Sequence, residues 1–93
     1  MNLKQLEAFV QVAEGGSFSK AAKELFLTQP TISSHISSLE RELNARLFVR
    51  NTKEVSLSED GIKLYKYAQF MVRVVLMVSL SSPLNPVQKE KLK

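Results

Sequence analysis

The chain contains no cysteine and only one histidine among its 93 residues. Without cysteine there is no disulfide framework, no zinc finger and no thiol nucleophile. The single histidine, His35, has no visible partner in the sequence for metal binding or catalysis. The sequence also lacks a glycine-rich phosphate loop, a serine nucleophile motif and a carboxylate pair on an apolar face. We therefore expect a protein that is not an enzyme and that holds no cofactor and no metal.

Long hydrophobic runs are missing as well. The run FMVRVVLMVSL, which begins at Phe70, is too short to span a bilayer and contains Arg73. The opening MNLKQLEAFV lacks the build of a signal peptide, because Glu7 and other polar residues interrupt it. The sequence therefore predicts a cytoplasmic protein that uses no membrane.

Length and charge set broad bounds on the partner. The length allows one domain with a modest core. The 13 Lys and Arg residues outnumber the 9 Asp and Glu residues, for a net charge of +4. This excess is compatible with a polyanion as the partner, although many small soluble domains are equally basic.

The most informative segment begins at residue 29, where the sequence predicts a helix with two unlike faces. Its apolar residues recur at spacings of four, three and four, which favours an inward-facing stripe of Ile32, Ile36, Leu39 and Leu43. The other face carries small polar side chains, namely those of Gln29, Ser33, Ser34, Ser37 and Ser38. Serine adds little to helix stability, so a face of small residues indicates close approach to a partner. We interpret that partner as the DNA major groove; the alternative is a serine-rich face that is simply solvated.

The first half of this helix holds the candidate base-reading residues. Gln29 can make paired hydrogen bonds to adenine, and Ser33 and Ser37 can serve bases or phosphates. Thr28 is a good N-cap, and Pro30 falls in the first turn, where its missing N–H costs nothing. The end that faces DNA would then be the positive end of the helix dipole.

Three further residues could hold the DNA backbone. His35 lies next to the serines, where it could contact a phosphate, although a lone surface histidine is most often only solvated. Lys20 and Lys23 fall on the preceding helix and could fix the register of the protein without reading sequence. Ordinary surface charge explains these two lysines equally well.

Two shorter helices precede this segment. An apolar stripe from Leu3 to Ala13 predicts a first helix, which ends at the glycines at positions 15 and 16. Ser17 can cap a second helix through Leu25, and the turn LFLT then leads into the third, as a helix-turn-helix requires. Asn44 follows the third helix at a position where a left-handed residue is expected.

The pattern then changes to a period of two. Residues 47–49 and 55–57 predict two short strands around the polar turn 50–53. We interpret this hairpin as a wing with a basic tip, because an ordinary hairpin would not need both Arg50 and Lys53. Lys53 is expected nearest the minor groove, whose negative potential attracts a cation.

A long last helix is predicted from residue 59 to residue 79, capped by Ser58. Its apolar positions include Ile62, Tyr65, Ala68, Val72, Val75 and Leu76. This stripe is too long for so small a domain to cover, so we expect a second copy to cover it. The alternative is a helix that folds back on its own domain. Residues 80–93 contain two helix-breaking prolines and are expected to form a flexible tail.

The block AAKELFLTQPTISSHISSLERELNARLFVR, followed by LSEDG, closely resembles the N-terminal DNA-binding domain of LysR-type transcriptional regulators. The resemblance implies a mainly α winged helix-turn-helix at residues 1–58, with a three-helix core, a two-stranded wing and a C-terminal linker and dimerisation helix. It also implies a bacterial homodimer that binds an interrupted palindrome in double-stranded DNA and regulates transcription. The DNA contacts implied by the resemblance fall on Gln29, Pro30, Thr31, Ser33, Ser34, Ser37, Arg50 and Lys53.

The sequence departs from the family pattern at three points. Asn44 replaces the usual glycine, and Glu54 stands in a wing that usually carries more glycine or arginine. The family also continues into a large effector-binding domain, so we expect a small-molecule co-inducer only if such a domain exists outside these residues. The alternative function is a truncated protein-interaction module that forms heterodimers with full-length regulators.

Overall fold

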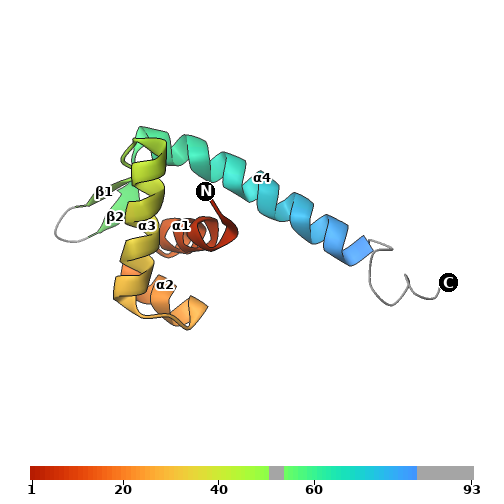
Figure 1. Cartoon of the computed structure of the whole chain (residues 1–93), viewed down its shortest axis with the longest axis horizontal. Helices are drawn as coiled ribbons and strands as arrows, with labels where there is room; N and C mark the ends of the chain where they lie inside the picture. Colours follow the sequence, from red (N-terminus) through yellow and green to blue (C-terminus); the bar gives the residue numbers. More distant parts are fainter. Residues whose placement is uncertain (51–53, 82–93) are drawn as a thin grey trace.

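The computed structural model describes residues 1–50 and 54–81. The elements in chain order are α1 (Leu3–Gly15), α2 (Phe18–Leu25), α3 (Gln29–Leu43), β1 (Phe48–Arg50), β2 (Val55–Leu57) and α4 (Glu59–Ser81). Three helices pack together, a two-stranded hairpin projects to one side of them, and α4 runs away on the other side (Figure 1). The predicted winged helix-turn-helix is therefore confirmed.

Local capping explains where the first two helices begin and end. At the start of α1, the Asn2 side chain accepts a hydrogen bond from the Gln5 N–H, and the Gln5 side chain accepts one from the Asn2 N–H. Gly16 ends the helix in the left-handed region, at φ 66°. Ser17 Oγ then accepts a hydrogen bond from the Lys20 N–H at 3.1 Å, as the sequence predicted for the cap of α2.

Two residues other than glycine have positive φ among the described residues. Asn44 follows α3 at φ 53°, which confirms the predicted left-handed position. Phe26 ends α2 at φ 57°, and nothing in the sequence predicted a phenylalanine in this conformation. The left-handed conformation costs a residue with a side chain roughly 1–2 kcal/mol. The Phe26 side chain is 93% exposed, so burial of the ring does not offset this cost. The turn of the helix-turn-helix therefore holds a strained, solvent-facing ring.

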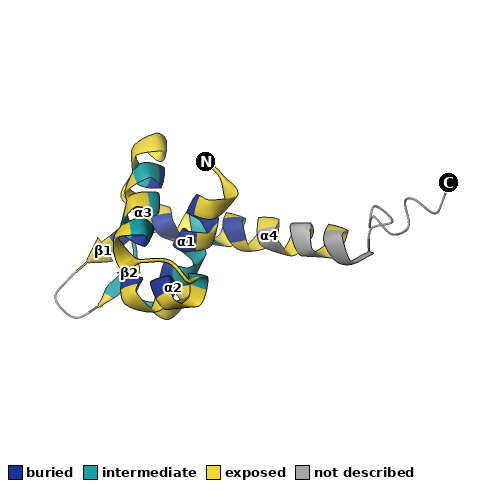
Figure 2. Cartoon of the chain, turned by 60° about the horizontal axis from the view of Figure 1, so that its bottom comes forward, coloured by how far each residue is buried: buried dark blue, intermediate teal, exposed yellow. Residues whose placement is uncertain are grey.

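The core is built around the aromatic residues. The Phe9 ring lies 5.4 Å from the Phe48 ring and 6.5 Å from the Tyr65 ring, which joins α1 to the hairpin and to α4. The buried apolar residues are Leu6, Ala8, Phe9, Val12, Phe18, Ala21, Ala22, Ile32, Ile36, Leu39, Leu47, Phe48 and Ala68. Figure 2 shows that the buried positions lie on the facing sides of the helices.

The inward stripe of α3 is confirmed except at its end. Ile32, Ile36 and Leu39 are fully buried, whereas Leu43 is 39% exposed. The last turn of α3 extends past the part of the helix that packs on the core, and its end is exposed in Figure 2. The periodicity predicted the direction in which Leu43 points but could not show where the neighbouring helix ends.

The hairpin pairs β1 and β2 as antiparallel strands, with Phe48 opposite Leu57 and Arg50 opposite Val55. The first strand begins at Phe48, one residue later than predicted. Leu47 is buried just before it, and its N–H donates to Glu40 Oε2 at 2.8 Å. Arg50, which was predicted in the turn, ends β1, and the rest of the predicted tip, including Lys53, lies outside the described residues.

The start of α4 is tied to the end of the hairpin. Ser58 Oγ accepts a hydrogen bond from the Gly61 N–H at 2.9 Å and donates one to the Arg46 carbonyl at 2.6 Å. This confirms the predicted cap. Ala68 is fully buried, and the hydroxyl of Tyr65 donates to Glu14 Oε2 at 3.0 Å. Partial burial, followed by the hydrogen bond to Glu14, raises the pKa of Tyr65.

The first half of α4 therefore packs back on its own domain, whereas its second half extends away from it (Figure 1). The helix continues to Ser81, and the rest of the expected tail, residues 82–93, lies outside the described residues.

Candidate nucleic-acid interface

The N-terminal half of α3 presents the predicted base-reading residues to solvent. Gln29, Ser34 and Ser37 are exposed, and Ser33 is half-buried on the same side of the helix. The helix start is held by Thr28, whose hydroxyl oxygen accepts from the Thr31 N–H at 3.3 Å. The Thr28 and Thr31 hydroxyls share a further hydrogen bond of 2.8 Å. Pro30 lies in the first turn, as predicted.

Two polar residues of α3 lie apart from this exposed row. Ser38 was grouped with the polar face, but it is half-buried, and its Oγ accepts from Gln5 Nε2 at 3.2 Å. It therefore faces α1. His35 is half-buried, and its predicted contact with a phosphate stays a prediction.

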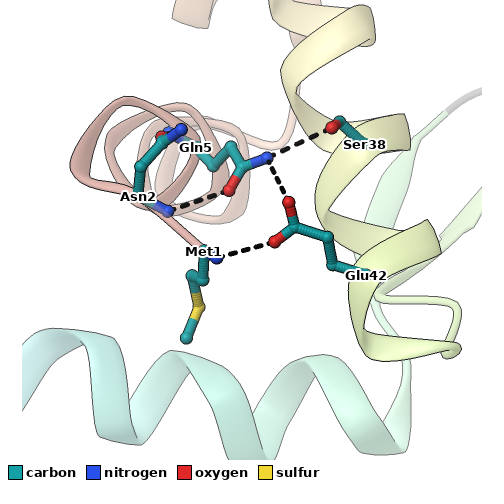
Figure 3. A network of polar contacts seen from close by, with 5 residues as sticks. All are labelled: Met1, Asn2, Gln5, Ser38 and Glu42. Atoms are coloured by element: carbon teal, nitrogen blue, oxygen red, sulfur yellow. Dashed lines mark hydrogen bonds and ion pairs between the residues drawn. The ribbon is translucent and has the colours of Figure 1, made fainter.

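Figure 3 shows the polar network to which Ser38 belongs. Gln5 is 4% exposed and also donates from Nε2 to Glu42 Oε2 at 3.5 Å. The Met1 ammonium lies 2.6 Å from the other Glu42 oxygen. The hydrogen bond from this ammonium, followed by the one from Gln5, lowers the pKa of Glu42. The network joins the start of α1 to the second half of α3 and so helps to set the direction of α3.

Arg50 occupies the base of the wing rather than a free tip. Its Cζ lies 4.6 Å from the centroid of the Phe18 ring, a cation–π contact worth about 0.5–1 kcal/mol at an exposed site. The Phe18 ring in turn packs edge-on against Phe48, at 6.1 Å between centroids. The guanidinium predicted to contact DNA is therefore held over the aromatic core.

A groove of about 560 Å³ opens between the second half of α3 and the base of the wing. Its lining residues are Ser37, Glu40, Arg41, Asn44, Ala45, Arg46 and Arg50. Sequence reasoning missed Arg41 and Arg46. Arg41 could have been found, because it continues the four-residue spacing of Ser33 and Ser37 along the same side of the helix.

Lys20 lies away from this groove, at the start of α2. It is exposed and lines a different hollow together with Glu14, Lys23 and Glu24. The mixture of charges in that hollow does not build a strongly basic surface. The role of Lys20 in holding the DNA backbone stays a prediction.

The six residues predicted for the dimer interface fall into three groups. Ile62 is 46% exposed, whereas Tyr65 and Ala68 pack against their own domain. The side chains of the remaining three lie outside what the structure describes: Val72, Val75 and Leu76. Large apolar side chains outside this set of six are also exposed along α4: Tyr67, Phe70, Met71, Val74, Met77 and Val78.

Residues 1–50 and 54–81 contain no cluster of three acidic or histidine side chains that could hold a metal ion. In the same ranges, none of the helices combines the length and the apolarity needed to cross a membrane.

Three packed helices, a polar exposed α3 and a hairpin beside it define a winged helix-turn-helix. Residues 3–62 match the family model for bacterial regulatory helix-turn-helix proteins of the lysR family, and the chain therefore belongs to this family. Members of the family are transcriptional regulators.

Two curated relatives illustrate the match. The chain is 43% identical over 74 residues to the uncharacterized regulator YxjO of Bacillus subtilis. The matched segment covers 80% of this chain and 25% of YxjO. It is 38% identical over 90 residues to the regulator BenM of Acinetobacter baylyi. The matched segment covers 96% of this chain and 30% of BenM. The chain therefore spans less than a third of the length of either relative.

Two solved structures are similar over nearly the whole chain. The BenM DNA-binding domain in complex with catB site 1 DNA has a TM-score of 0.81 at 37% identity, and the match covers 91% of this chain and 96% of that one. The CbnR DNA-binding domain in complex with DNA has a TM-score of 0.83 at 28% identity, with coverage of 92% and 99%.

Proposed function

We propose that this chain binds double-stranded DNA sequence-specifically, as the DNA-binding part of a cytoplasmic transcriptional regulator that acts as a homodimer on an interrupted palindrome. The observation that carries the proposal is the exposed first half of α3, where small polar side chains leave room for a DNA groove. The similar BenM and CbnR domains, whose structures were solved with DNA, support it.

The residues of α3 have separate roles in this proposal. Gln29 reads a base through its amide, and Ser33 and Ser37 reach bases or phosphates from the next two turns. The cap residue Thr28, followed by Pro30, brings the positive end of the helix dipole toward the DNA. Thr31 and Ser34 complete the contacts of the first two turns.

The wing supplies a second contact. Arg50 approaches the backbone from the base of the wing, where the Phe18 ring orients its guanidinium. Lys53, which lies outside the described residues, is proposed as the contact to the minor groove.

The part of α4 from Tyr67 onward supplies the dimer contact. Tyr67, Met71, Val74 and Val78 are exposed and recur at spacings of four, three and four, which is the pattern of a two-helix seam. Two copies packed along this seam would cover apolar surface that one domain leaves in water. The dimer would then present two recognition helices to the two halves of a palindrome.

Fluorescence anisotropy tests the DNA-binding proposal with an interrupted-palindrome duplex and a shuffled duplex of equal length, across a salt series. The wild type should favour the palindrome. Gln29→Ala should lose this preference, while Lys53→Ala should weaken binding to both duplexes. Gln11→Ala is the matched control, since Gln11 lies on α1. Equal and weak binding of the wild type to both duplexes would contradict the proposal.

The exposed apolar surface of α4 also favours a second candidate function, a module that forms heterodimers with full-length regulators. Sedimentation of an equimolar mixture with a full-length relative such as BenM would then show a mixed dimer. DNA affinity that neither Gln29→Ala nor Lys53→Ala changes would favour this second function.

A further inference from the structure

The groove between α3 and the wing base concentrates positive charge on one surface. Arg41, Arg46 and Arg50 line it, together with a single carboxylate, that of Glu40. The uncharged lining residues Ser37 and Asn44 are polar and add further hydrogen-bonding groups.

The single carboxylate is already engaged. One Glu40 oxygen accepts the Leu47 N–H at 2.8 Å and lies 4.0 Å from Arg46 Nε. The Glu40 side chain is 13% exposed, whereas the Arg46 side chain is 75% exposed. The guanidinium groups therefore dominate the surface that an approaching ligand would meet.

The place of the groove in the fold indicates which anion it suits. One wall carries Ser37 and Arg41, which continue the row of the proposed base-reading residues along α3. The other wall carries Arg50 at the base of the wing. When α3 enters the major groove and the wing approaches the adjacent minor groove, the DNA strand that separates the two grooves must pass between them.

We infer that this groove seats backbone phosphates of that DNA strand, with Arg41 and Arg46 as contact residues in addition to those proposed above. The inference rests on the proposed DNA binding. Guanidinium groups suit phosphates because their N–H groups can pair with two oxygens at once. Such contacts fix the position of the protein on the duplex without reading its sequence.

The dipole of α3 makes these arginines necessary for phosphate binding in the groove. The groove lies near the C-terminal end of α3, which carries partial negative charge and by itself repels a phosphate. Arg41 in the last turn of the helix and Arg46 just beyond it reverse this potential. Removal of their charge should therefore weaken phosphate binding in this groove strongly.

The test is the salt dependence of binding to the palindromic and shuffled duplexes for wild type, Arg41→Gln, Arg46→Gln and the double variant. Each lost phosphate contact should reduce the slope of log affinity against log salt by about 0.9 per bound subunit. Each loss should therefore shrink the affinity penalty between 50 and 200 mM salt by about 3.5-fold. Both duplexes should be affected alike, because the contacts do not read sequence.

Two controls separate phosphate contact from simple loss of charge or of folding. Lys66→Gln removes one exposed positive charge from α4, away from the groove, and should leave the slope unchanged. Arg41→Lys keeps the charge and should keep most of the slope. Circular dichroism melts test whether Arg46→Gln, which loses its contact with Glu40, is folded at the assay temperature.

The outcomes are distinguishable. If wild type binds neither duplex, the proposed function fails and this inference fails with it. If wild type binds DNA but the double variant keeps the wild-type slope, only the phosphate groove is refuted. A loss in the double variant that Lys66→Gln reproduces would also refute it, because general charge would then explain the effect.

Discussion

Replacement of Gly61 by alanine should destabilise this protein, although the same change normally stabilises a helix. Gly61 lies in the first turn of α4, is buried, and packs against the backbone just before β1. An added Cβ would overlap the Leu47 carbonyl oxygen. It would also lie 2.9 Å from Leu57 Cδ2 and 3.0 Å from the Leu47 carbonyl carbon. Carbon atoms pack at roughly 3.5–4.0 Å, so α4 would have to move outward.

The magnitude follows from the opposing effects. Alanine in a helix interior gains about 0.5–1 kcal/mol over glycine. Overpacking against a backbone that cannot rotate away costs about 1–3 kcal/mol or more. The movement of α4 also strains the 2.9 Å hydrogen bond from the Ser58 N–H to the Leu47 carbonyl, worth about 1 kcal/mol. We therefore expect a net loss of about 2 kcal/mol, which lowers the Tm of a domain of this size by roughly 8–16 °C.

The assay is thermal unfolding followed by circular dichroism, at one fixed protein concentration because dimerisation would shift the Tm. Gly15→Ala is the matched control, since a Cβ there would lie 3.8 Å from Lys20 Cβ, an ordinary contact. That variant should be as stable as wild type or slightly more stable. A Tm for Gly61→Ala equal to or above that of wild type would refute the reasoning, because the backbone would then have room for the methyl group.

The left-handed residues and the network of Figure 3 also contribute to stability in ways that can be measured. Phe26→Asn should raise the free energy of unfolding by about 0.5–1 kcal/mol, because asparagine tolerates positive φ better; a loss in urea unfolding would mean that the ring makes stabilising contacts. Asn44→Ala should cost about 1 kcal/mol and Asn44→Gly should cost nothing, and equal losses in the two variants would contradict this explanation. The lowered pKa of Glu42 stabilises the fold above the ordinary carboxyl pKa, and this contribution is lost as pH falls through the lowered value. The Tm of wild type should therefore fall more steeply in acid than that of Glu42→Gln, and parallel Tm curves against pH would rule the effect out.

The sequence predicted those features that depend on neighbours within one helical turn. Thr28, Ser17 and Ser58 accept hydrogen bonds from backbone N–H groups three residues ahead, so each cap is visible in a four-residue window. The left-handed Asn44 follows from the same local reasoning. The left-handed conformation of Phe26 could not be predicted in this way, because phenylalanine has no preference for positive φ.

The sequence predicted the part of the candidate site that lies on the polar side of α3, but not the groove beside the wing. Gln29 and Ser37 are exposed as expected, because the spacing of the buried residues leaves their side of α3 free. Ser38 faces Gln5, which is 33 residues away in the chain, and no helical period can show such a contact. Arg46 became a candidate only when the groove between α3 and the wing base was visible.

The sequence by itself determined the order of the elements, the caps and the polar side of α3, because hydrophobic period and capping act over three or four residues. The tertiary structure alone decided that Tyr65 and Ala68 are used within the domain, and that Arg50 rests on Phe18. It also decided that three arginines from α3, the following turn and the wing line one groove. These outcomes depend on how far each helix extends past its neighbour and on which distant segments of the chain lie side by side. Both are determined by the packing of residues that are far apart in the sequence into one core.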